Sequence, residues 1–173
     1  MTLVGIVEYG AGNIDSVVRA VENCGGKPIV TKTPKDLKAV THIILPGVGS
    51  FATGMKNLRQ RGYEEELHEQ VKERKIPFLG ICLGMQFLCT HGTEAVDTPG
   101  LGWLTGSVIR LSPSSPDEKV PHMGWNNVAL VKASTLFDGI ESGRDFYFVH
   151  SYHFKVNNQP DILTTTPYCG AVS

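Results

Sequence analysis

Short apolar runs alternate with turns and amphipathic segments along the first half of the chain. Residues 3–7, 42–45 and 76–82 are such runs, and each is followed by a turn that contains glycine. After the first run, apolar positions within residues 14–21 recur at helical spacing, and a further strand pattern follows at residues 29–30. Strands separated by helices are typical of βαβ units, so we expect a mainly parallel central sheet flanked by helices.

Two more helical segments are predicted between these strands. Residues 33–39 combine a threonine cap with proline at the first helical position, which is typical of a short helix. Residues 55–75 have a helical pattern throughout, and their clustered charges indicate a solvated face.

The pattern changes in the second half of the chain. Short strand-like runs at residues 108–111, 128–131, 145–149 and 162–164 follow one another without long helices between them. We therefore expect an α/β fold in which a mixed or antiparallel sheet extends the parallel one.

Length and charge exclude several classes of protein. A chain of 173 residues is long enough for one domain and too short for two ordinary ones, so we expect a single domain. Its 16 basic and 17 acidic residues give a net charge of −1 without any basic run, which argues against nucleic acid as a partner. No apolar run approaches the roughly 18 residues of a membrane span, and the chain opens on a strand rather than a leader.

The cysteines provide neither a metal site nor a disulfide framework. Cys24, Cys82, Cys89 and Cys169 form no Cys-x-x-Cys pair and show no regular spacing with histidines. We expect no metal, no cofactor and a reducing, cytoplasmic location.

Cys82 stands where the apolar strand of residues 76–82 breaks sharply into a helix. Gly80 and Gly84 flank it, and glycine lets strand and helix backbones approach closely. Gly-x-Cys-x-Gly is the pattern of a nucleophile elbow, which exposes its central side chain at the carboxyl end of a strand. The alternative is a small, buried structural cysteine.

Two glycine turns follow other strands. Residues 46–49, Pro-Gly-Val-Gly, can expose backbone N–H groups. The alternative is an ordinary loop without a functional role. The position of the turn favours a functional role, because the carboxyl ends of neighbouring parallel strands open into one crevice. We name residues 46–49 the 46–49 turn and expect them to supply half of an oxyanion hole. Gly10 and Gly12 do not complete a dinucleotide fingerprint, because Asp15 replaces the third glycine. Asn13 in that turn either caps the next helix or faces a partner.

Two polar clusters lie in the second half. Residues 121–126 place a histidine and a tryptophan beside a predicted glycine turn, and residues 147–153 place hydroxyls and imidazoles at the end of an apolar strand. Each cluster fits two interpretations equally well. Its residues are either structural, with their hydrogen bonds made within the protein, or functional.

These motifs together resemble a known family. Pro-Gly-Val-Gly at 46–49, Gly-Ile-Cys-Leu-Gly-Met-Gln at 80–86, Pro-His-Met-Gly-Trp-Asn at 121–126 and His-Ser-Tyr at 150–152 resemble the glutaminase subunit of imidazole glycerol phosphate synthase. That family belongs to the triad-type class I glutamine amidotransferases. The resemblance implies hydrolysis of glutamine to glutamate and ammonia, with ammonia passing to a barrel-shaped cyclase subunit.

The resemblance also implies roles for individual residues. Cys82 is the expected nucleophile, and the expected oxyanion groups are the backbone at Gly47, Val48 and Leu83. The residues expected to contact glutamine are Gly49, Gln86, His150, Ser151 and Tyr152. Those expected to lie towards the cyclase are Asn13, Trp125 and Tyr147.

One departure from the family is clear in the sequence. The family completes its triad with a histidine and a glutamate two residues apart, and no His-x-Glu occurs in these 173 residues. We therefore expect residues 1–173 to be a single amidotransferase domain that lacks its C-terminal His-x-Glu segment, with His150 and His153 as the nearest candidate bases. A docking or gating pseudoenzyme and an amidotransferase for another synthase remain the alternatives.

Overall fold

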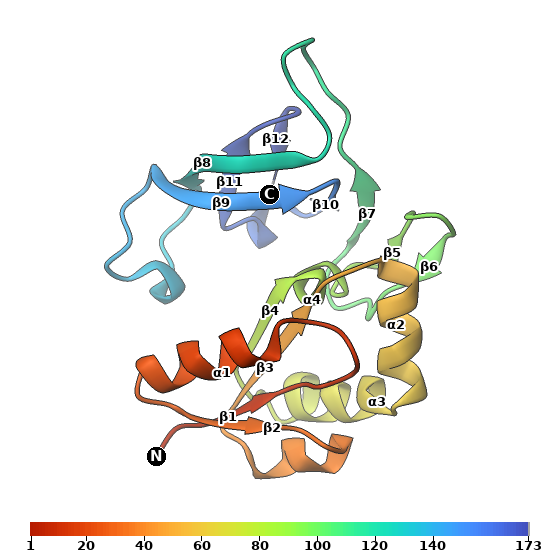
Figure 1. Cartoon of the computed structure of the whole chain (residues 1–173), viewed down its shortest axis with the longest axis vertical. Helices are drawn as coiled ribbons and strands as arrows, with labels where there is room; N and C mark the ends of the chain where they lie inside the picture. The colour runs from red at the N-terminus through yellow and green to blue at the C-terminus, as the bar shows by residue number, and fades with distance from the viewer. Residues whose placement is uncertain (173) are drawn as a thin grey trace. The chain divides into compact units, whose positions relative to one another are not determined.

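The computed structural model describes residues 1–172 and divides into two compact units (Figure 1). The first unit is Met1–Leu88 and the second begins at Cys89. Within the described residues, no helix is both long and apolar enough to cross a membrane, and no cluster of histidine, cysteine and carboxylate side chains could hold a metal ion.

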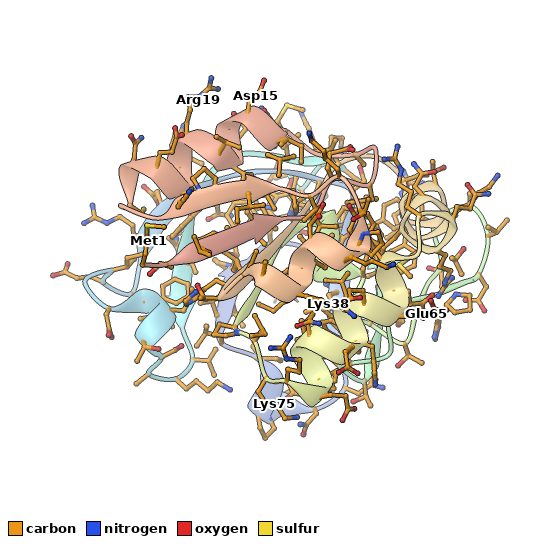
Figure 2. The ribbon with its side chains drawn as sticks, turned by 90° about the horizontal axis from the view of Figure 1, so that it is seen from below. Met1, Asp15, Arg19, Lys38, Glu65 and Lys75 are labelled. Carbon is orange, nitrogen blue, oxygen red and sulfur yellow. The ribbon has the colours of Figure 1, made fainter. Side chains whose placement is uncertain are left out.

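The first unit is built on a four-stranded sheet in the order β2-β1-β3-β4. All of its strand pairs are parallel, which confirms the predicted parallel sheet. The strands are β1 (Leu3–Ile6), β2 (Lys27–Val30), β3 (His42–Gly47) and β4 (Phe78–Cys82). Helices cover both faces. In Figure 2, α1 (Ile14–Asn23) lies on one side of the sheet, and the 3₁₀ helix η1 (Pro34–Ala39) and α3 (Tyr63–Leu67) lie on the other.

Helix α1 begins and packs as its sequence indicates. The Asn13 side chain accepts a hydrogen bond from the Ser16 N–H at 3.3 Å, which caps the helix. Its apolar stripe packs on Val4 and Ile6 of β1, and Asp15 points away from the sheet (Figure 2). Asn13 therefore has a structural role as a cap.

The segment predicted to be helical over residues 55–75 is helical in the structure, but the helix is interrupted. The segment forms α2 (Phe51–Gln60), α3 and a π-helical stretch at His68–Glu73. Gly62 separates α2 from α3 because it takes a left-handed φ of 74°, which redirects the chain. The redirection buries Tyr63, whose hydroxyl lies 2.7 Å from that of Thr31.

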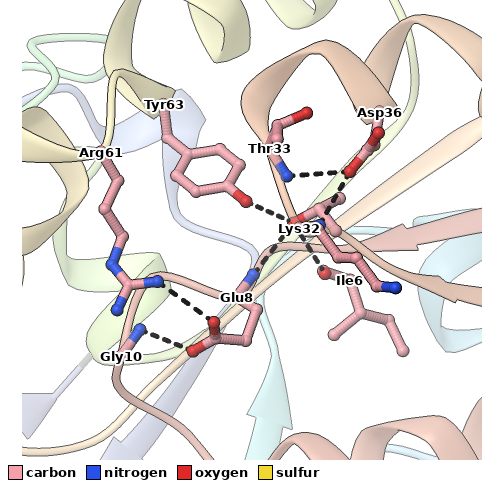
Figure 3. Close-up of polar contacts among 9 residues, drawn as sticks. Ile6, Glu8, Gly10, Lys32, Thr33, Asp36, Arg61 and Tyr63 are labelled. Carbon is pink, nitrogen blue, oxygen red and sulfur yellow. Dashed lines mark hydrogen bonds and ion pairs between the residues drawn. The ribbon is translucent and has the colours of Figure 1, made fainter.

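A polar network fixes the turn between β1 and α1 (Figure 3). The Thr31 hydroxyl accepts the Glu8 N–H at 3.1 Å. The Glu8 carboxylate accepts the Gly10 N–H at 2.8 Å and pairs with Arg61 at 3.2 Å. The backbone on both sides of Tyr9 is therefore anchored.

The second unit consists of two four-stranded sheets, which confirms the predicted mixed and antiparallel character. The mixed sheet, in the order β10-β7-β5-β6, contains β5 (His91–Gly92), β6 (Thr98–Pro99), β7 (Gly106–Arg110) and β10 (Tyr152–Val156). The antiparallel sheet, in the order β12-β11-β8-β9, contains β8 (His122–Leu130), β9 (Arg144–His150), β11 (Thr164–Pro167) and β12 (Ala171–Val172). Short 3₁₀ helices occur at Thr135–Phe137 and Gln159–Asp161.

The glycine turn predicted within residues 121–126 is wrong. His122 to Asn126 are the first part of β8, and residues 128–130 of the strand predicted at 128–131 are the end of the same strand. Gly124 does take a positive φ of 133°, but the strand continues through it because β9 pairs with β8 over seven consecutive positions.

Candidate active site

The strand-to-helix turn at Cys82 is present and strained. Strand β4 ends at Cys82, and the one-turn helix α4 (Leu83–Gln86) begins at the next residue. Cys82 has φ 53° and ψ −113°, a conformation that costs a non-glycine residue about 1–3 kcal/mol. Its side chain is exposed at the carboxyl end of the strand, where a nucleophile would be accessible.

The two glycines of the elbow are needed for close backbone packing. A Cβ atom on Gly80 would lie 2.6 Å from the Cα atom of Met85. One on Gly84 would overlap the carbonyl oxygen of Leu45 in the neighbouring strand. The elbow is therefore pressed against β3, which ends in the 46–49 turn.

The 46–49 turn lies directly beside the candidate nucleophile. In the parallel pairing of β3 with β4, Gly47 is the register partner of Cys82. Val48 is 58% exposed, and Gly49 has φ 100° with no atom near the position of an added Cβ. Ser50 then precedes α2. The structure thus brings together Cys82, Leu83 and the backbone of the turn, as an oxyanion hole requires.

Gln86 completes the part of the predicted site that lies in the first unit. It is the last residue of α4, one helical turn after Cys82, and it is partly buried.

Tyr9 is a site residue that the sequence analysis missed. It is fully buried, and its ring packs edge-on against Phe87 with centroids 6.0 Å apart. Burial, and secondarily the charge of Cys82, raises the pKa of Tyr9. The available signal was positional: Tyr9 follows β1, and β1 lies next to β3, so its turn opens at the same sheet edge as Cys82.

In the second unit, His150, Ser151 and Tyr152 form the passage from β9 to β10, where the chain leaves one sheet for the other. His150 Nδ1 lies 3.0 Å from the carbonyl oxygen of Tyr152, and His150 Nε2 lies 3.0 Å from Nδ1 of His122. His122 Nε2 lies 3.4 Å from the amide nitrogen of Asn126.

Only one assignment of donors and acceptors fits these three hydrogen bonds. The carbonyl of Tyr152 can only accept and the amide nitrogen of Asn126 can only donate. His150 Nδ1–H therefore donates to the carbonyl, His122 Nδ1–H donates to His150, and Asn126 donates to His122. Burial, and then the neighbouring His150, lowers the pKa of His122, which agrees with a neutral imidazole.

His153 is the second histidine that the sequence offers as a candidate base. Burial, followed by His150 and Lys155, lowers the pKa of His153. Its Nδ1 is buried and has no hydrogen-bond partner among residues 1–172.

The opposite face of the β8–β9 pair is apolar and exposed. Trp125 lies opposite Tyr147 and Met123 lies opposite Val149, so all four share one face. We call these four residues the outer patch. Trp125 is 73% exposed and meets Tyr147 edge-on at a centroid distance of 5.7 Å. Trp125 and Tyr147 are thus brought together, whereas Asn13 belongs to the first unit.

The fold and the elbow define a class of protein, and the sequence matches it: the chain belongs to the glutamine amidotransferase class-I family, which aligns with residues 5–170. It is 43% identical over 157 residues to imidazole glycerol phosphate synthase subunit HisH 1 of Campylobacter jejuni, covering 91% of this chain and 78% of that protein. It is 40% identical over 177 residues to the HisH subunit of Ruegeria pomeroyi, covering 99% and 84%. Against HisH of Moorella thermoacetica the identity is 44% over 168 residues, covering 97% and 78%. The family predicted from the sequence is confirmed.

Solved structures agree on the fold. A glutamine amidotransferase crystal structure matches with a TM-score of 0.71 at 20% identity, covering 93% of this chain and 78% of that one. The structure of PurLQS from Thermotoga maritima matches with a TM-score of 0.68 at 20% identity, covering 96% and 74%. At this sequence identity the similarity concerns the fold alone, and it confirms the predicted fold class.

Proposed function

We propose that this chain is the glutaminase subunit of an imidazole glycerol phosphate synthase. It hydrolyses glutamine to glutamate and ammonia, and the ammonia serves a cyclase subunit in histidine biosynthesis. The observation that carries the proposal is the pairing of Gly47 with Cys82, which places a strained, exposed thiol beside a glycine turn. The relatives named HisH make another synthase the less favoured assignment.

The proposed chemistry is covalent. The Cys82 sulfur attacks the side-chain carboxamide carbon of glutamine, and the carbon–nitrogen bond then breaks as the nitrogen takes up a proton and leaves as ammonia. Water hydrolyses the remaining thioester, which releases glutamate and restores the thiol. The N–H groups of Val48 and Leu83 stabilise the oxyanion, and one such donor is typically worth about 2.7–4 kcal/mol.

Substrate binding is assigned to two segments of the chain. Gly49 and Gln86 contact the side chain of glutamine, and His150, Ser151 and Tyr152 bind its α-amino acid end. The neutral hydrogen-bonded chain from Asn126 to Tyr152 supports this assignment, because it holds the 150–152 passage in one conformation.

The general base is not assigned to His150. Both of its ring nitrogens are engaged in the neutral state, one as donor and one as acceptor, so it has no free lone pair for the thiol proton. We propose that residues 1–173 act as one amidotransferase domain. The base is assigned to a histidine–glutamate pair of the family's type, and no His-x-Glu occurs among these residues.

The outer patch is the proposed docking surface for a barrel-shaped cyclase. An exposed tryptophan and tyrosine flanked by methionine and valine have the composition of a protein interface. Asn13 is assigned to the same partner, in addition to capping α1, and the cytoplasm is the proposed location.

Isotope transfer tests this function. Glutamine labelled with ¹⁵N in its side-chain amide is supplied to the full-length protein together with the cyclase and its ligand. Appearance of ¹⁵N in the cyclised product is expected. Release of labelled ammonia without incorporation would remove the synthase assignment, and absence of any release would remove the glutaminase assignment.

A further inference from the structure

The hydroxyl group of Tyr9 is buried without a partner. It has no solvent exposure and no hydrogen bond among residues 1–172. Tyr63, the other fully buried tyrosine of this unit, bonds its hydroxyl to Thr31 at 2.7 Å. Buried hydroxyls are normally paired, so an unpaired one invites a functional explanation.

The unpaired hydroxyl lies at the junction of the elbow and the 46–49 turn. A Cβ atom on Gly47 would come within 2.5 Å of the Tyr9 oxygen, 2.9 Å of the Leu83 Cβ and 3.0 Å of the Gly84 nitrogen. The hydroxyl therefore rests against the Cα atom of Gly47, the register partner of Cys82. Burial, and secondarily the nearby charge of Cys82, raises the pKa of Tyr9, so the hydroxyl stays protonated and able to donate.

Tyr9 cannot move to find an acceptor. The Glu8 carboxylate holds the Gly10 N–H and Arg61, and Thr31 holds the Glu8 N–H (Figure 3). The Tyr9 ring is packed against Phe87. A partner for the hydroxyl must therefore come to it.

The peptide group between Gly47 and Val48 can rotate to bring an acceptor to the Tyr9 hydroxyl. Val48 is largely exposed, and Gly49 takes a positive φ in open space, so little packing opposes a rotation there. Turning the Val48 N–H towards an oxyanion at Cys82 turns the Gly47 carbonyl the opposite way.

We propose that Tyr9 is a positioning residue, whose hydroxyl donates a hydrogen bond to the Gly47 carbonyl when the Gly47–Val48 peptide rotates to aim its N–H at the oxyanion. This inference rests on the proposed glutaminase function. Tyr9 acts on the reaction only through the turn, by favouring its competent conformation.

The test compares Tyr9→Phe with Tyr63→Phe in full-length protein bound to its cyclase. Loss of one neutral hydrogen bond made only in the competent state predicts a kcat about three- to tenfold lower for Tyr9→Phe, with KM within about twofold and an unchanged or higher Tm. Tyr63→Phe loses a bond already present and should lower Tm without lowering kcat. An unchanged kcat for Tyr9→Phe, or a loss of kcat matched by a fall in Tm, would overturn the proposal.

A second measurement does not depend on turnover. A diazo ketone analogue of glutamine alkylates Cys82 in ¹⁵N-labelled protein, and the amide resonance of Val48 is followed. A large shift is expected in the wild type, and a clearly smaller one in Tyr9→Phe. Equal shifts would overturn the role of Tyr9, whereas unequal shifts in a protein that releases no glutamate would overturn the glutaminase proposal instead.

Discussion

Gly84 lies so close to the carbonyl group of Leu45 that a Cβ atom on Gly84 would overlap the carbonyl oxygen and lie 2.8 Å from the carbonyl carbon. Both obstacles are backbone atoms of a central strand, so no side-chain rotation can relieve the clash. The spacing between the elbow helix and β3 therefore depends on glycine at this position.

Gly84→Ala should destabilise the first unit by more than about 4 kcal/mol, because either the elbow or β3 must be displaced. Urea unfolding monitored by circular dichroism measures the effect. Gly25→Ala is the matched control, since Gly25 has φ 76° but open space around it, and it should cost only about 1–2 kcal/mol. Equal costs for the two variants would show that the close approach is not what requires glycine.

Stability should fall as pH drops below about 6.5, the ordinary pKa of histidine, because folding lowers the pKa of His122 and His153. Below this pH the two imidazoles bind protons more readily in the unfolded chain than in the folded one, so acid favours unfolding. Above it the imidazoles are neutral in both states, and their contribution to stability is fully present. Urea unfolding between pH 7.5 and pH 5.5, as a rough range, measures the slope.

The variant His153→Gln should flatten this pH dependence, since it removes one buried imidazole. The exposed His68 provides the control, and His68→Gln should retain the slope of the wild type. A slope that His153→Gln leaves intact would assign the acid sensitivity to other groups.

Trp125→Ala should weaken binding of the cyclase by about 2 kcal/mol or more, roughly 30-fold in Kd, because large aromatic side chains commonly dominate interface energies. Folding should be unaffected, since the side chain is mostly exposed. Titration calorimetry gives the affinity. Leu136→Ala removes another exposed apolar side chain outside the outer patch and should leave Kd unchanged; a normal affinity for Trp125→Ala would move the docking surface elsewhere.

The elbow at Cys82 and the neighbouring 46–49 turn could be predicted from the sequence because the patterns that encode them are local. Gly80, Cys82 and Gly84 encode a strand-to-helix turn within five residues, and the short apolar runs predicted the parallel sheet. Once the strands were placed, the proximity of Gly47 to Cys82 followed from topology.

The features that sequence reasoning missed depend on long-range packing. The helical periodicity of residues 55–75 concealed the break at Gly62, which is explained only by the burial of Tyr63 against Thr31. Gly124 was predicted to lie in a turn, but pairing with β9 keeps it in a strand. Tyr9 was missed because nothing in its own segment shows that its hydroxyl lies beneath Gly47.

Glutamate release by Cys82→Ser is the most direct test of the account, whose central claim is that the Cys82 thiol attacks glutamine. Full-length wild type, Cys82→Ser and Cys24→Ser are each assayed with the cyclase and its ligand. Serine preserves shape but its hydroxyl ionises far less readily than a thiol, so Cys82→Ser should lose glutamate release by at least about a thousandfold. Cys24 is exposed and lies outside the site, so Cys24→Ser should match the wild type. Glutamate release by Cys82→Ser at the wild-type rate would contradict the account.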